Sequence, residues 1–136
     1  MQTKSNHFYF IGIIATALLA SVSVTAGEKS SRHDFPPAVT GFHDVMAPLW
    51  HSSPGEGRDE RICKDYSRLS SKLDKIRSEV VPKEVDKADW KSAAYQLQQY
   101  TLKVKLACDS NQSPDATFAD VHSAFHNLVR LVGHRH

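Results

Sequence analysis

Residues 62–80 read ICKDYSRLSSKLDKIRSEV, and the apolar side chains of this stretch recur at alternating steps of four and three residues. The apolar positions are Ile62, Tyr66, Leu69, Leu73, Ile76 and Val80. Such steps place the apolar side chains along one side of an α-helix, and charged or small polar residues occupy the rest of its surface. A helix of this kind must bury its apolar side against other helices, so the stretch predicts a helical bundle.

Three other segments repeat this spacing. Residues 86–109 carry the inward positions Trp90, Ala94, Leu97, Thr101, Val104 and Cys108. The helix-start sequence Ser113-Pro114-Asp115 precedes a segment with the positions Phe118, Val121, Phe125, Leu128 and Val132. A shorter segment near residue 40 has the positions Val39, Phe42, Met46 and Leu49 or Trp50.

Turn sequences separate these segments, and none of them shows the period-two alternation of a strand. Residues 52–57 read SSPGEG and end the first segment, while Val81-Pro82 ends the second. We therefore expect an all-α fold, an up-down-up-down four-helix bundle over residues 38–133. Its first helix should be short and kinked at Pro48, because proline has no N–H and crowds the preceding turn.

The N-terminal residues have the pattern of an export signal. Lys4 precedes an apolar run over residues 8–20, and Val24-Thr25-Ala26 is a suitable cleavage sequence. The run is shorter than the about 20 residues of a membrane span. We expect a signal peptide over residues 1–26, a flexible leader over 27–37, and a periplasmic or secreted protein that does not stay inserted in the membrane. An uncleaved N-terminal anchor is the alternative.

The charge of the exported chain argues against a nucleic-acid partner. The whole chain has 17 Lys and Arg against 15 Asp and Glu, and loss of Lys4 leaves 16 against 15. Nucleic-acid-binding proteins carry a clustered basic surplus, which is missing here, as are glycine-rich phosphate-binding loops.

The two cysteines, Cys63 and Cys108, are predicted to form a disulfide. An even number of cysteines suits an oxidising compartment, and neither CxxC nor CxxCH occurs. An antiparallel hairpin of the second and third helices turns near Pro82. Cys63 lies about twenty residues before that turn and Cys108 about twenty-five after it, so both should lie at the same end of the hairpin.

Seven histidines follow the signal peptide, and His122 and His126 are four residues apart in the sequence HSAFH. This spacing places two imidazoles on one side of a helix, close enough to share a metal ion. The metalloprotease motif HExxH is absent, because Ser123 follows His122. The alternative interpretation is a pair of exposed histidines without a ligand.

His43 is the predicted third ligand. On an ideal helix, the apolar side of the first segment is centred about 60° from His43. The apolar side of the fourth segment is centred about 70° from His122, in the same rotational direction. Antiparallel neighbours bring like-handed flanks together, so His43 should approach the His122–His126 pair. Three imidazoles suit Zn²⁺, Cu²⁺ or Ni²⁺. His51 is a possible fourth ligand if the kink at Pro48 redirects it.

A haem site is the other interpretation of this interface. Met46, on the inward side of the first helix, could pair with His122 or His126, and we expect His126, as the two axial ligands of a non-covalent haem. In this respect the chain resembles exported four-helix cytochromes of the b type and the c′ type over residues 38–133. The resemblance implies electron transfer, although the c′-type CxxCH is missing.

These observations predict a non-enzymatic, exported module that binds a transition metal ion with His43, His122, His126 and His51. It would sequester, deliver or sense the ion. The alternatives are the haem-binding electron carrier and a structural or partner-binding bundle without a cofactor. No motif in the sequence indicates a particular protein partner. The C-terminal tail, residues 134–136, is expected to be frayed, so its histidines are not predicted ligands.

Overall fold

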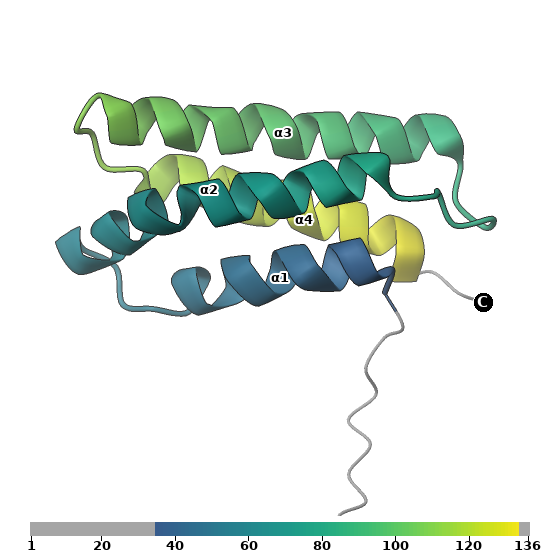
Figure 1. Ribbon diagram of the computed structural model, residues 1–136, viewed down its shortest axis with the longest axis horizontal. Coiled ribbons are helices and arrows are strands. Elements are labelled where there is room, and N and C mark those ends of the chain that lie inside the picture. Colours follow the sequence, from purple (N-terminus) through teal and green to yellow (C-terminus); the bar gives the residue numbers. More distant parts are fainter. Residues whose placement is uncertain (1–34, 134–136) are drawn as a thin grey trace, which may run out of the picture. The chain divides into compact units, whose positions relative to one another are not determined.

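The computed structural model describes residues 35–133, which form four α-helices and no strand. The helices are α1 (Pro37–Trp50), α2 (Glu56–Ser78), α3 (Lys87–Asp109) and α4 (Asp115–Gly133). Each helix packs against its neighbours in sequence, and α4 returns to lie against α1 (Figure 1). The predicted all-α bundle is therefore confirmed. The predicted signal peptide, the leader up to residue 34 and the tail 134–136 lie outside the described residues.

Most of the positions that the helical spacing selected lie in the core. Every inward position of the fourth segment is buried, and Ile62, Leu97 and Val104 have no exposed surface. Thr101 is also buried, and its hydroxyl donates to the backbone oxygen of Leu97 at 2.8 Å, so it brings no unpaired donor into the core. None of the helices within residues 35–133 is both long and apolar enough to cross a bilayer.

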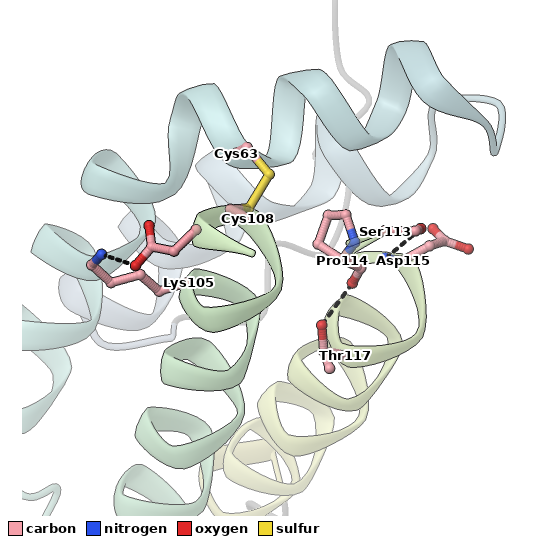
Figure 2. Close-up of a disulfide and its surroundings, with 8 residues drawn as sticks. Cys63, Lys105, Cys108, Ser113, Pro114, Asp115 and Thr117 are labelled. Atoms are coloured by element: carbon pink, nitrogen blue, oxygen red, sulfur yellow. Dashed lines mark hydrogen bonds and ion pairs between the residues drawn. A yellow bond between two sulfur atoms is a disulfide. The ribbon is translucent and has the colours of Figure 1, made fainter. Parts of the chain in front are cut away.

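Local capping explains where α3 and α4 begin. The carboxylate of Asp86 accepts from the backbone N–H groups of Ala88 and Asp89, which have no partner within the helix. At the start of α4, Ser113 Oγ accepts weakly from the N–H of Asp115, at 3.4 Å, and Thr117 Oγ1 donates to the carbonyl of Pro114 (Figure 2). Both helix starts agree with the sequence prediction.

The end of α2 differs from the prediction. The apolar spacing included Val80, but α2 stops at Ser78 and Val80 is 85% exposed. The hydroxyl of Ser78 donates to carbonyls of the last turn, and the Glu79 carboxylate accepts from the N–H of Ala38 in the first turn of α1, at 3.2 Å. Glu79 leaves the helix and satisfies a donor of its neighbour, which helical periodicity does not encode.

The first helix begins earlier than predicted and ends at Trp50, before the turn sequence of residues 52–57, as predicted. It starts at Pro37, which was assigned to the leader, and Phe35 already packs against the core. Pro48 is exposed within the last turn, and α1 continues past it to Trp50. Proline at this position removes only the backbone bond to the carbonyl of Asp44, so it is compatible with the end of a helix.

A disulfide joins α2 to the end of α3. The Cα atoms of Cys63 and Cys108 are 5.6 Å apart, and the bridge lies beside the turn that leads into α4 (Figure 2). The predicted pairing is confirmed, and with it the antiparallel hairpin from which it was argued.

Candidate metal centre

His122 and His126 form a close pair on α4. Their Nε2 atoms are 3.1 Å apart and their ring centroids 4.5 Å apart. His126 is exposed and His122 is half-buried. At this distance an Nε2–H of one ring can donate to the Nε2 of the other, and an ion in place of that proton would receive both lone pairs. The predicted pairing of these two side chains is therefore present in the structure.

Trp50, at the end of α1, orients His122. The two rings stack with their centroids 4.0 Å apart and their planes 12° from parallel. Trp50 also contacts Phe118, at 6.4 Å between centroids, and so anchors His122 to the core. A ring stacked in this way has few free rotamers, and Trp50 leaves the Nε2 atom turned toward His126.

Arg58 of α2 contacts the Trp50 ring and was not among the site residues predicted from the sequence. Its side chain is buried, its guanidinium lies 4.9 Å from the Trp50 ring centroid, and it pairs with Asp115 at 3.0 Å. The carboxylate of Asp115 thus partners the buried charge of Arg58. Continuing the alternation of four and three residues back from Ile62 reaches Asp59, so the apolar spacing of α2 does not single out Arg58.

The environment of His122 favours its neutral form. Burial lowers the pKa of His122, and the positive charges of His126, His51, Arg58 and His43 lower it further. A metal ligand must present a neutral imidazole, and a lowered pKa keeps the ring neutral at a lower pH. Two of these charges, His43 and His51, belong to α1 and to the residue that follows it.

The pKa of His122 predicts a pH dependence of stability. The unfolded chain binds a proton on this ring near the usual pKa of about 6.5, whereas the folded chain binds it only at lower pH. Between these two values the unfolded state holds more protons, so the free energy of unfolding falls as the pH is lowered. Above that window the ring is neutral in both states and contributes nothing. Urea unfolding at pH 7.5 and 5.5 measures the difference.

The variant His122→Gln should show a smaller loss of stability between the two pH values than the natural chain. Ser123→Ala, which changes the adjacent exposed residue, serves as the control and should retain the full loss. Identical pH dependence in all three proteins would contradict the assignment to His122.

His43 was predicted to lie beside the His122–His126 pair, but its ring contacts a different residue. Its ring stacks on Phe125, with the centroids 5.9 Å apart, and Phe125 in turn contacts His126 at 6.4 Å. His51 is the exposed residue that caps the C-terminus of α1. No group of three or more His, Cys, Asp or Glu side chains within residues 35–133 is arranged to hold a metal ion. The structure therefore brings two predicted ligands together and leaves the other two nearby.

Comparison with family models, curated proteins and solved structures found no match. The resemblance to exported cytochromes thus rests on architecture, and the function has to be argued from the residues themselves.

The residues of the haem alternative do not fit an axial pair as they are packed. Met46 is 2% exposed within the core, whereas His126 lies on the surface. Phe42 and Phe125 stack between α1 and α4, with their centroids 5.3 Å apart. A porphyrin bound by Met46 would have to displace this packing, so we derive no haem chemistry for the chain.

Proposed function

We propose that this protein is an exported transition-metal-binding module in which His122 and His126 chelate a divalent ion. The observation that carries the proposal is the 3.1 Å separation of the two Nε2 atoms, on a surface open to solvent. Trp50 supports it by holding His122 in place, and the lowered pKa of His122 supports it by keeping that ligand neutral.

The choice among divalent ions follows from the type of ligand. With metal–nitrogen bonds of about 2.0–2.1 Å, atoms 3.1 Å apart subtend about 95–102° at the ion. This range lies between the right angle of a tetragonal site and the tetrahedral angle of a structural zinc site, so the angle favours neither geometry. Imidazole ligands suit Cu²⁺, which has the highest affinity in the divalent series, and Cu²⁺ is therefore the ion proposed.

In this proposal the two histidines leave the other coordination positions of the ion to water. His43 and His51 are both exposed, and either could replace a water ligand after its side chain rotates. A site with two fixed ligands and exchangeable others releases its ion more readily than a closed four-ligand site. The proposal therefore favours sequestration, delivery or sensing of the ion over a structural metal, and it assigns no catalytic role.

Trp50 provides a direct test, because paramagnetic Cu²⁺ quenches the fluorescence of a nearby indole. The chain has two tryptophans, and Trp90 is buried on α3. In a Trp90→Phe background, Cu²⁺ should quench the remaining emission with a saturating, one-to-one titration. Removing residues 134–136 should leave this titration unchanged, since the tail histidines bind at most loosely.

The ligands are tested in the same background. His122→Ala or His126→Ala should weaken Cu²⁺ binding by at least about tenfold, a loss of about 1.4 kcal/mol. Ser123→Ala, between the two ligands, is the matched control and should bind as the parent does. His43→Ala and His51→Ala identify the residue that completes the site. Equal affinities for the His122, His126 and Ser123 variants would rule the proposal out.

A further inference from the structure

The first half of α2 has few anchors in the bundle. The buried side chains of α2 are Arg58, Ile62, Leu69, Leu73 and Ile76. Only the first two of these precede residue 66. Gly55, the residue before the helix, has no side chain that could cap its free N–H groups. The disulfide from Cys63 to Cys108 is therefore a principal anchor of this half of α2.

Arg58 belongs to this half of the helix. It precedes Cys63 by five residues, which is about 7.5 Å along the helix axis. Its guanidinium is buried and pairs with Asp115 of α4 at 3.0 Å, but neither Arg58 Nε nor Asp115 Oδ1 has a hydrogen-bond partner within residues 35–133. An ion pair without these hydrogen bonds fixes Arg58 only loosely. The position of Arg58 therefore depends on how firmly the backbone of α2 is held.

The same disulfide fixes the other side of the ion pair. Cys108 precedes Asp115 by seven residues, at the turn that leads into α4 (Figure 2). Backbone hydrogen bonds hold this turn, because the N–H groups of residues 110–112 donate to carbonyls at the end of α3. One covalent bond thus sets how closely the first half of α2 approaches the start of α4.

We propose that this disulfide regulates the metal site, with Arg58 as the positioning residue that links the two. The guanidinium lies 4.9 Å from the centroid of the Trp50 ring, and that ring stacks on His122. While the bridge is closed, Arg58 keeps Trp50 packed, and Trp50 keeps His122 turned toward His126. The proposal rests on the proposed function, because the ion concerned is the one that these two histidines bind.

Opening the bridge is a two-electron reduction. A dithiol reductant supplies two electrons and two protons: the bond between Cys63 and Cys108 breaks, each sulfur becomes a thiol, and the dithiol becomes a disulfide. Both cysteines are only half-buried, so the bridge is within reach of such a reductant. The first half of α2 then loosens and Arg58 leaves Trp50. His122 gains rotamers that metal binding must restrict again, so the reduced chain holds its ion less tightly.

The charge of Arg58 acts in the opposite direction, and one variant separates the two effects. A positive charge near the site disfavours a cation, so loss of Arg58 would by itself favour binding. Arg58→Lys keeps the charge but lacks the planar group that stacks on the Trp50 ring. With the bridge closed, this variant should bind Cu²⁺ about three- to tenfold more weakly, the cost of ordering one side chain on binding.

Competition of the whole chain with a Cu²⁺-chelating dye measures the affinity. The double variant Cys63→Ser, Cys108→Ser stands for the open bridge, because a thiol reductant would itself bind the ion. It too should bind Cu²⁺ about three- to tenfold more weakly than the natural chain. Leu73→Ala removes a buried side chain from the second half of α2 and controls for lost stability alone. It should bind as the natural chain does, and circular dichroism confirms that each variant is folded.

The NMR resonances of the His122 ring report the stack without any metal. An imidazole that lies 4.0 Å from an indole ring is shielded by it, so the ring protons of His122 should resonate upfield of those of an exposed histidine. In the double serine variant and in Arg58→Lys, these resonances should move toward the exposed value. In Leu73→Ala they should stay in place.

The two readouts distinguish the possible failures. A natural chain that binds no Cu²⁺ would overturn the proposed function, and this proposal with it. Binding by the natural chain, with less than about a twofold loss in the double serine variant and in Arg58→Lys, would overturn this proposal alone. Weaker binding with unmoved His122 resonances would also overturn it, since the loss would not pass through the stack. If the double serine variant does not fold, Arg58→Lys decides by the same two readouts.

Discussion

Replacing both Cys63 and Cys108 with alanine should lower the free energy of unfolding by about 4 kcal/mol. The bridge joins residues 45 positions apart, at one end of the α2–α3 hairpin. A cross-link across a segment of this length restricts the unfolded chain far more than the folded one. Since domains of this size are stable by about 5–15 kcal/mol, the loss would consume a large share of the total.

Chemical denaturation with and without a reducing agent provides the measurement and its control. The reductant should lower the stability of the natural chain to nearly that of the alanine variant, and it should leave the variant unchanged. A difference of less than about 1 kcal/mol between the oxidised natural chain and the variant would contradict the expected role of the bridge.

Phe125→Ala should lower the free energy of unfolding by about 3–5 kcal/mol, the range for removing a large buried aromatic side chain. Phe125 is 3% exposed and stacks on Phe42, which has no exposed surface. This stack joins α4 to α1, so its loss leaves a cavity at the contact that also positions the histidines.

The same substitution separates stability from metal binding. Phe125→Leu keeps most of the volume and should cost clearly less than the alanine variant. Because Trp50, and not Phe125, holds His122, the folded Phe125→Leu variant should still bind Cu²⁺ with both histidines. Equal losses of stability for the alanine and leucine variants would contradict the expectation that the loss follows the volume removed from this contact.

Much of the fold could be predicted because helix formation and the disulfide depend on short or regular patterns. The spacing of Ile62, Leu69 and Leu73 identified a helix, since side chains three and four residues apart share one side of it. Ser113, before Pro114, marked a helix start for an equally local reason. The pairing of Cys63 with Cys108 followed from the position of a single turn between two helices of similar length.

The candidate site was predicted only in part. The spacing of His122 and His126 is local, and the structure places these two rings together. His43 was assigned to the same ion from the angles of ideal helices, which give the direction of a side chain but not what lies in front of it. The ring of Phe125 is stacked against His43, and that contact depends on how two separate helices pack.

The sequence by itself therefore determined the four helices, their antiparallel order, the disulfide and the histidine pair, because each follows from periodicity within a helix or from one turn. The tertiary structure alone decided that Trp50 stacks on His122, that Arg58 is buried beside it, and that Phe125 lies against His43. These contacts join residues on different helices, and close packing of particular rings selects them. No pattern within one helix encodes that choice.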